Sequence, residues 1–356
     1  MVFRQGSSNA TLARICYCAV TSLAMLTACS EVGPEKNLDN YIERLERTLQ
    51  LEAPERIPET SHKPPKVSEL RQTISSGNLG TLDFLSLSGC AVQITIGKRN
   101  SSLGIMASDS QRLLLALEYL EHAPECIRHM RSLNRNEIAT VLEDAFRLKQ
   151  RQLPKLIYNA TIANTEFRQF WKAPEKLRSY PAQTSSAVLS ALSALNQQVN
   201  RWLKGDYTAS NLEIEILLSE IAKGDGGALI KALGIQQSYL DSANTLLKMK
   251  LADGHLCTDQ RRDAAATILP NVVQKFFIGE VQPWSADLGR RYHELLPPIS
   301  KLEELLSAGL SEKYEQWRHE RDEVLSLLVT APSNHVGILK ETLDSCGGFG
   351  TFTAAS

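Results

Sequence analysis

The stretch AVLSALSALNQQVNRWL, residues 187–203, carries an unbroken helical repeat of apolar side chains. The apolar positions follow one another at intervals of four, three, four and three residues, up to a stop signal at Gly205. They are Val188, Leu192, Leu195, Val199 and Trp202. Positions with this spacing share one face of an α-helix. We therefore expect an amphipathic helix that packs against a neighbour in nearly antiparallel bundle geometry.

The same periodicity runs through most of the chain. Its earliest instance, Leu38–Leu49, has charged residues on the opposite face and predicts a first amphipathic helix. Capping-box patterns predict further helix starts at Ser108 with Gln111 and at Asn134 with Glu137. No pair of segments alternates as two strands would. The sequence therefore predicts an all-α fold, a multi-helix bundle of antiparallel helix pairs tied by disulfides.

Prolines and glycines punctuate this pattern. Residues 53–66 hold four prolines and no apolar face, which predicts an extended linker. Lys172–Ser186 is the best internal boundary, and the KGDGG run, residues 223–227, predicts a turn between two helices. Other prolines are expected to start, split or end helices: Pro124, Pro154, Pro270, Pro297, Pro298 and Pro332. Ser333–Ser345 would then be a separate short helix at the end of the fold.

These breaks divide the chain into five parts. They are a signal peptide (1–28), a tether with the first helix and the proline-rich linker (29–66), an N-terminal helical half (67–178), a C-terminal helical half (179–346) and a disordered tail (347–356).

The stretch FLSLSGCAVQITIGKRNSSLG, residues 84–104, is the most distinctive segment of the N-terminal half. Leu82, Leu85, Val92 and Ile96 share a face if a helix passes through Gly89. Lys98 and Arg99 would suit the negative end of the helix dipole, and Asn100 suits a left-handed C-terminal position. The β-branched run 92–96 leaves a strand as the alternative. Capping explains the chemistry of Arg99–Gly104 only in part.

The first 28 residues are typical of a bacterial lipoprotein signal peptide. Arg4 and Arg14 are their only charges, and residues 15–28 form an uncharged run of 14 residues, too short to span a membrane comfortably. The run ends in Leu26-Thr27-Ala28-Cys29, a lipobox whose cysteine would carry the lipid. An ordinary signal peptide or a short uncleaved anchor is the alternative. Ser30 after the cysteine points to the outer membrane, facing the periplasm.

The chain after cleavage is close to neutral. Without Arg4 and Arg14 it holds 37 basic and 40 acidic residues, a formal net charge of −3. A protein that binds nucleic acid, or that binds anionic lipid through a polybasic segment, is expected to be strongly basic, and this chain is not. We therefore expect no nucleic-acid partner. The expected partners are the membrane, which the N-terminal lipid would enter, and an envelope protein.

Four cysteines remain besides Cys29 in an oxidising compartment, and they allow three disulfide pairings. We favour Cys90–Cys126 within the N-terminal half and Cys257–Cys346, which ties the C-terminal end to the middle of the chain. The chain has no C-x-x-C, which argues against a redox dithiol or a zinc knuckle. Catalysis by one of these cysteines, with His122 or His129 near Cys126, is the alternative.

Catalytic and metal-binding signatures are absent from the sequence. It lacks a P-loop, a G-x-S-x-G elbow, an S-x-x-K and an H-E-x-x-H motif. His319 and Glu323 sit four residues apart and could ligate a metal, although a solvated helix face explains them better. The four tryptophans fit core packing better than a ligand groove. No catalytic residue, metal ligand or cofactor is therefore predicted.

Three stretches resemble one known family: LDNYIERL (38–45), LDFLSLSGCAVQITIGKRNSSLG (82–104) and SQRLLLALEYLEHAPECI (110–127). The chain resembles an uncharacterised family of gammaproteobacterial lipoproteins, the domain of unknown function numbered three-zero-eight-zero. The resemblance runs from about Leu38 to Cys346 and is most specific between Leu79 and Ile127. It implies a lipid-anchored envelope protein and carries over no functional residues.

The leading functional hypothesis is a non-enzymatic outer-membrane lipoprotein that scaffolds or assists envelope assembly. One alternative is a cell-wall or lipid-processing enzyme whose site is assembled from dispersed residues. The other is a carrier with an apolar ligand cavity between its helices.

Overall fold

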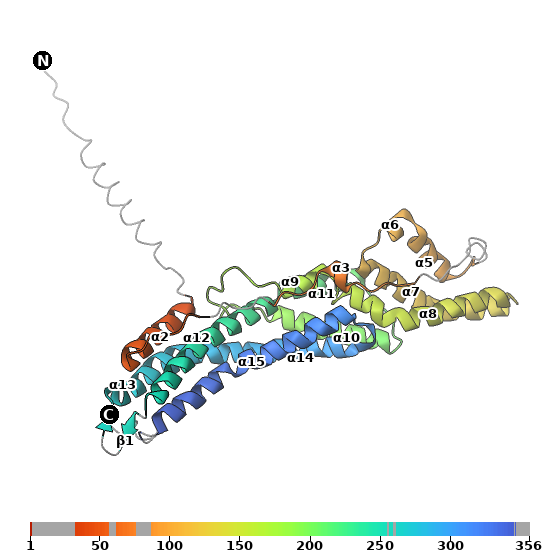
Figure 1. The fold of residues 1–356 in the computed structure, drawn as a ribbon. Coiled ribbons are helices and arrows are strands. Elements are labelled where there is room, and N and C mark those ends of the chain that lie inside the picture. Colours follow the sequence, from red (N-terminus) through yellow and green to blue (C-terminus); the bar gives the residue numbers. More distant parts are fainter. Residues whose placement is uncertain are drawn as a thin grey trace.

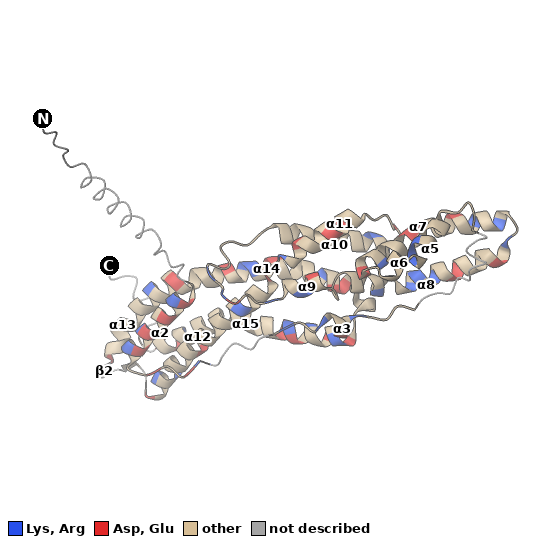
Figure 2. Ribbon diagram, turned by 90° about the horizontal axis from the view of Figure 1, so that it is seen from above, with Lys and Arg blue, Asp and Glu red and all other residues tan. Residues whose placement is uncertain are grey.

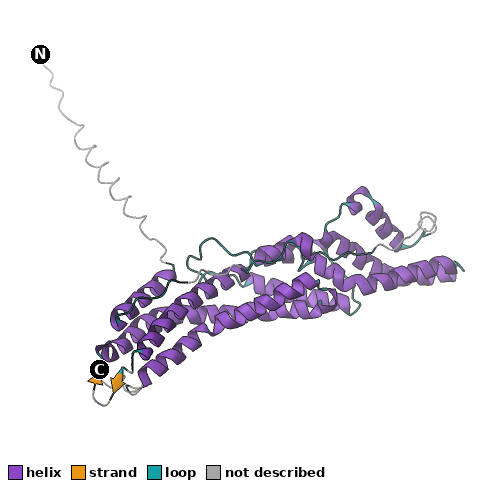
Figure 3. Ribbon diagram, in the orientation of Figure 1, coloured by secondary structure: helices purple, strands orange, loops and turns teal. Residues whose placement is uncertain are grey.

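The computed structural model describes Met1 and residues 33–56, 62–75, 87–254, 256–258, 261–344 and 346 of the chain. Long helices form an elongated, bowed body, with α2 (Glu35–Leu49) toward one end and α5–α8 at the other (Figures 1 and 2). Figure 3 shows that a small hairpin lies at the α2 end. The expected signal peptide apart from Met1, Cys29 and the whole of the expected tail lie outside the described residues.

The described elements are almost all helical, as predicted. After α2 come α3 (Val67–Leu70), α5 (Ala91–Asn100), α6 (Ser102–Ile105), α7 (Asp109–Ser132), α8 (Asn136–Ala160), α9 (Thr165–Phe170), α10 (Ala187–Leu203), α11 (Asn211–Ala222) and α12 (Gly226–Ala252). They continue with β1 (Cys257–Thr258), β2 (Arg261–Arg262), α13 (Ala264–Val272), the π-helix η1 (Val273–Val281), α14 (Gln282–Leu305), the 3₁₀ turn η2 (Ser307–Gly309) and α15 (Glu312–Asp344). β1 and β2 pair antiparallel.

The helix predicted at residues 187–203 forms as α10, and its apolar face is buried. Val188, Leu192, Leu195, Val199 and Trp202 all belong to the largest apolar cluster. That cluster also includes residues of α3, α7, α8, α9, α11, α12, α14 and α15. The loop at residues 172–186 lies where the boundary was expected, but the helices on its two sides share this one core.

Two smaller apolar clusters complete the interior. One joins α2 to α12, α13, η1 and α15. The other joins α5 to α7 and α8 through Val92, Ile96 and the Cys90–Cys126 pair, together with neighbours from the two longer helices. The amphipathic first helix predicted from Leu38–Leu49 is therefore confirmed, and the positions that set its repeat, Leu38, Ile42, Leu45 and Leu49, are all buried.

Most of the predicted proline breaks are wrong. Pro124, Pro154 and Pro332 lie inside α7, α8 and α15, and Pro297 and Pro298 lie inside α14. Pro270 also lies inside a helix, α13, which continues without a break through η1 into α14. An interior proline costs about 3 kcal/mol, whereas each fully buried leucine or isoleucine side chain contributes about 1.5–3 kcal/mol. The apolar faces on both sides of these prolines outweigh the cost.

The helix predicted through Gly89 is also wrong at its start. Gly89 has a positive φ of 92°, and α5 begins only at Ala91, with Cys90 as its N-terminal cap. The strand alternative for residues 92–96 is likewise excluded, since Val92 and Ile96 are buried on one face of α5. Asn100 is helical rather than left-handed, and Leu82 and Leu85 lie outside the described residues.

The predicted capping box at Ser108 and Gln111 forms at the start of α7. The second, at Asn134, does not. Asn134 instead takes the left-handed conformation, with φ of 57°, that ends α7, and α8 begins after Arg135. Lys223, Gly224 and Asp225 of the KGDGG run form the predicted turn between α11 and α12, while Gly226 and Gly227 already begin α12. A Cβ at Gly227 would lie 2.3 Å from the backbone of Lys172, so the start of α12 has no room for a side chain at this position.

Candidate functional site

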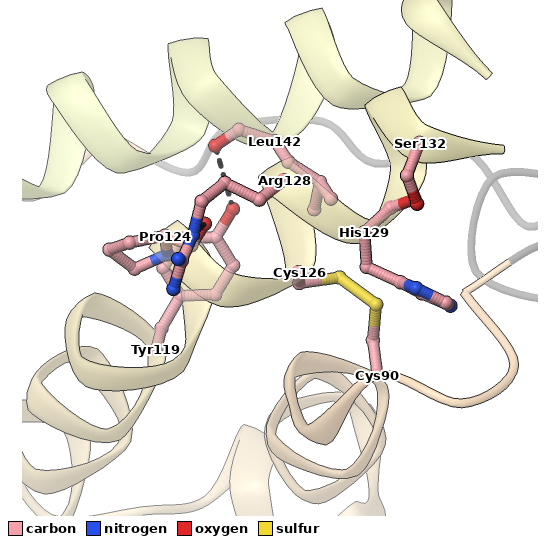
Figure 4. Close-up of a disulfide and its surroundings, with 8 residues drawn as sticks. All are labelled: Cys90, Tyr119, Pro124, Cys126, Arg128, His129, Ser132 and Leu142. Carbon is pink, nitrogen blue, oxygen red and sulfur yellow. Dashed lines mark hydrogen bonds between the residues drawn. A yellow bond between two sulfur atoms is a disulfide. The ribbon is translucent and has the colours of Figure 1, made fainter. Parts of the chain in front are cut away.

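The α5–α6 unit is fastened to α7 by covalent and ionic contacts. Cys90 and Cys126 form a disulfide, with His129 of α7 beside it in Figure 4. Lys98 Nζ lies 2.8 Å from a carboxylate oxygen of Glu118. Cys126 is buried and its sulfur is bonded, so neither cysteine of this pair is a free thiol. The alternative of a cysteine nucleophile is therefore wrong here, and the pair is a structural tie.

The Arg99–Gly104 segment is a tight turn from α5 into α6. The Ser101 hydroxyl accepts a hydrogen bond from the Gly104 N–H at 3.1 Å and donates one to the Lys98 carbonyl at 2.7 Å. A Cβ on Gly104 would lie 2.1 Å from that carbonyl oxygen and 2.5 Å from the carbonyl oxygen of Arg99. Only glycine fits this close approach, which explains a large part of the distinctive sequence.

A cavity of about 790 Å³ opens beside this turn. Its walls come from α5, α6, α7 and α8 and from residues 71–75, the extended segment that follows α3. The volume falls within the range of about 300–1,000 Å³ that is usual for small-molecule sites. The lining mixes apolar side chains with amides, hydroxyls and four cationic groups.

Residues 71–75 are held in place as one wall of the cavity. The Asn159 side-chain amide pairs with the backbone N–H and C=O of Gln72, both at 2.8 Å. Gln152 Nε2 donates to the Ser75 carbonyl at 3.1 Å, and Arg71 lies 2.6 Å from Asp109 of α7. All of these contacts are made within the chain, so the chain itself fixes this wall of the cavity in place.

The charge on the cavity lining is strongly positive. The cationic residues are Arg71, Arg99, Arg112 and Lys149, and the single acidic one is Asp109. Asp109 pairs with Arg71, while Arg112 donates to the carbonyl oxygens of Ala107 and Ile105. Arg99 and Lys149 have no ion-pair partner within the described chain.

The position of Lys149 in this cavity lowers the pKa of its ammonium group. Burial and, secondarily, the nearby Arg99 guanidinium lower the pKa of the Lys149 ammonium to about 8. Its Nζ lies 5.2 Å from the centre of the Tyr119 ring, a cation–π contact. The Tyr119 hydroxyl donates to the Leu142 carbonyl, and burial raises the pKa of this phenol, so Tyr119 stays neutral beside the lysine.

Thr95 adds an unused polar group to the cavity. Its side chain is only 2% exposed and lines the cavity from α5. Its Oγ1 has no hydrogen-bond partner among the described residues. A buried hydroxyl without a partner is unusual and costs about 1–3 kcal/mol. A ligand in the cavity would reach this oxygen only if the Thr95 side chain rotated toward it.

The other residues singled out from the sequence have structural or surface roles. Cys257 and Cys346 form the second disulfide, so both pairs are those favoured from the sequence. His319 Nε2 lies 3.2 Å from a carboxylate oxygen of Glu323 on an exposed helix face, and the described residues contain no cluster of three or more metal-ligating side chains. Trp171, Trp202 and Trp317 are buried in the main core and do not line a groove.

A buried charged network lies in the centre of that core. Arg321 of α15 is fully buried and donates to both carboxylate oxygens of Glu303 on α14, at 2.7 and 3.0 Å. The Tyr314 hydroxyl donates to the same carboxylate. The Arg321 guanidinium also lies 5.0 Å from the Trp171 ring and 5.2 Å from the Trp317 ring. The network satisfies its own charges and leaves no group for an external ligand.

The sequence singled out Arg99 and Gly104 but missed the rest of the cavity. Lys149 and Arg112 look like ordinary surface cations of amphipathic helices, and the amides of Gln72 and Asn159 carry no motif. Only the packing of α8 against α7, with α5 fastened to α7, brings them together. A weak signal existed in the glycine of the R-N-S-S-L-G turn, which indicates a close backbone approach.

These features define an elongated, disulfide-linked bundle that is almost entirely helical, with a basic cavity toward one end. The chain matches the family described as "Protein of unknown function (DUF3080)" over residues 38–348, and it belongs to that family. No curated protein and no solved structure matches the chain. Within the described part of the chain, no helix has the length and apolar character needed to cross a membrane.

Proposed function

We propose that this protein is a lipid-anchored outer-membrane lipoprotein that faces the periplasm and serves as an interaction module of the cell envelope. The lipid would be carried by Cys29, and the segment that follows would tether the helical body at the α2 side. The α5–α8 end would then extend away from the anchor and be available to a partner.

The observation that carries the interaction role is a group of exposed apolar side chains on α5 and α6. Ile94, Leu103, Ile105 and Met106 have relative exposures of 64%, 85%, 66% and 85%. Large apolar side chains scattered singly are normal on a surface, whereas several on one short unit mark an interaction surface. The disulfide and the Lys98–Glu118 pair hold this unit rigidly on α7.

Photo-crosslinking in living cells tests the interaction role. A photoreactive residue at Leu103 or Met106 should give a discrete crosslinked product with an envelope protein. The matched control is Leu327 of α15, an apolar side chain with 65% exposure that lies apart from α5 and α6. Equal labelling at all three positions would contradict a specific surface at α5–α6. A specific hydrolysed product without any crosslink would favour the enzyme alternative.

The anchor is tested separately by metabolic labelling with palmitate. Wild type should take up the label and fractionate with the outer membrane, and Cys29→Ala should do neither. Label of equal intensity on Cys29→Ala would remove the lipoprotein assignment. This result would leave the crosslinking experiment interpretable, because the two depend on different residues.

A further inference from the structure

We propose that the cavity between α5, α6, α7 and α8 is a binding site for a small molecule that bears an oxyanion, a phosphate or a carboxylate, and that Arg99 and Lys149 hold this group. The inference is independent of the anchor, and of the four apolar residues in the proposed interaction surface only Ile105 also lines the cavity. It rests on the charge of the cavity, on its preformed walls and on a buried hydroxyl, that of Thr95, for which the described residues offer no hydrogen-bond partner.

The charge balance indicates an anion. Four cationic side chains and one carboxylate line the cavity, and the carboxylate is committed to Arg71. Arg99 and Lys149 are close enough for the guanidinium to disfavour the charged ammonium. Arg99 is exposed and Lys149 is half-buried, and these like charges repel one another, so an oxyanion between them would reverse that energy. A guanidinium matches the two oxygens of a phosphate or carboxylate in a bidentate geometry.

The rest of the cavity is suited to a ligand larger than a free ion. Thr95 Oγ1 offers a buried hydrogen-bonding group without a partner among the described residues. Asn100 lines the cavity on the α5 side, while Ile96, Leu148 and Leu156 provide apolar surface. A volume of about 790 Å³ accommodates an organic anion with both polar and apolar parts. The ligand class is therefore an organic phosphate or carboxylate rather than an inorganic ion alone.

Binding should be linked to protonation of Lys149. Its pKa of about 8 in the free protein results from burial and from Arg99, with the cations Arg71 and Arg112, the anion Asp109 and the neutral Tyr119 also lining the cavity. A bound oxyanion raises this pKa, so the protein takes up a proton when it binds the ligand above about pH 8. Affinity should consequently fall as the pH rises from about 8 to about 10.

The test is calorimetric titration of the full chain, purified in detergent, with glycerol 3-phosphate, with inorganic phosphate and with acetate. Wild type should bind at least one probe saturably, with proton uptake at about pH 8.5 seen as a dependence on the ionisation enthalpy of the buffer. Lys149→Met and Arg99→Gln should each weaken binding at least tenfold. Lys149→Arg keeps the charge and should retain most of the affinity while losing the proton uptake.

The matched control is Arg151→Gln. Arg151 is an exposed cation on α8, two residues beyond Lys149, and does not line the cavity. This variant removes the same charge and should bind as wild type does. Far-ultraviolet circular dichroism of every variant separates loss of the site from loss of the fold. Thr95→Val, which is isosteric, should weaken binding of the organic phosphate at unchanged helicity.

Vesicles distinguish a soluble ligand from a lipid headgroup. If the site takes phospholipid, phosphatidylglycerol vesicles should compete with glycerol 3-phosphate in wild type, and if it takes soluble anions they should not. The proposal is overturned if no anionic probe binds to wild type. It is equally overturned if Arg151→Gln weakens binding as much as Lys149→Met, because the effect would then be general surface charge.

Discussion

At the scale of single residues, the two cations without ion-pair partners in the described part of the cavity define its electrostatics. Lys149 has a pKa of about 8, lowered by burial and by Arg99. In Arg99→Gln the second cause disappears while burial remains. We expect the pKa of Lys149 to rise in this variant without reaching the ordinary value of about 10.4. Titration of carbon-labelled lysine side chains by NMR measures it, and Arg151→Gln should leave the value unchanged.

The buried Arg321–Glu303 pair makes a different prediction at the same scale. Arg321→Met leaves the Glu303 carboxylate buried without its cation, which should cost about 3–5 kcal/mol of unfolding free energy. The double variant Arg321→Met/Glu303→Leu removes both charges and should recover most of that loss. Denaturant unfolding followed by circular dichroism gives the values. Equal stability of Arg321→Met and the double variant would contradict this prediction, because removing the unpaired carboxylate would then recover nothing.

At the scale of elements, the turn from α5 to α6 depends on one glycine. Gly104→Ala places a Cβ against the carbonyl oxygens of Lys98 and Arg99, so the turn must open. We expect a loss of about 1–3 kcal/mol in unfolding free energy, as for other overpacked sites. The displaced turn should also weaken any anion binding that involves Arg99. Thermal and denaturant unfolding measure the first effect.

The control for this variant is Gly337→Ala. Gly337 lies in α15 and is exposed, and a Cβ at this position would meet no atom within 4 Å beyond the backbone of its own helix. Alanine there should stabilise the helix by up to about 1 kcal/mol, because glycine is the poorer helix former. A loss of stability equal to that of Gly104→Ala would show that the turn has no special need for glycine.

The helices were largely predictable because their apolar faces repeat along the sequence. The register of α2 and of α10 follows directly from Leu38 and Val188 onward. Proline misled the prediction because local rules treat Pro297 or Pro332 as a stop, whereas burial summed over a long helix exceeds the cost of one missing hydrogen bond. Gly89 misled it in the opposite direction, since a helical pattern on both sides cannot reveal a positive φ.

The cavity was much less predictable than the helices. Arg99 and Lys149 are 50 positions apart in the sequence, and their proximity results from how α5 and α8 each pack on α7. No local pattern distinguishes a helix cation that faces water from one that faces a cavity. The sequence could therefore indicate the unusual turn but not the other residues that surround the cavity.

At the scale of the whole molecule, a buried network joins the first described helix to the last. The Tyr41 hydroxyl lies 2.8 Å from His335 Nε2, and His335 Nδ1 lies 2.6 Å from Asn244 Oδ1. Because Asn244 Oδ1 accepts, Nδ1 carries the proton and Nε2 accepts from Tyr41. This arrangement requires a neutral imidazole, and burial lowers the pKa of His335 to about 3.

The network predicts acid sensitivity. The unfolded chain takes up a proton at His335 below about pH 6.5, while the folded protein does so only at about pH 3. Between these values the unfolded state binds more protons, so stability falls as the pH falls, by at most about 1.4 kcal/mol per pH unit. Unfolding free energies at about pH 7 and about pH 5 should therefore differ by about 2 kcal/mol more in wild type than in His335→Gln. Identical pH dependence would mean that His335 does not require the neutral form.

The order of the disulfides along the chain has a consequence for how the protein matures. In the sequence, the first disulfide loop ends at Cys126 and the second begins only at Cys257 and ends at Cys346. The two loops therefore neither overlap nor enclose one another. If the chain is exported from its N-terminus, these four cysteines emerge in the order of the native pairs. An oxidase that joins each free cysteine to the next free one then produces the native pairs directly. Maturation should then depend on a thiol oxidase and be insensitive to the loss of a disulfide isomerase.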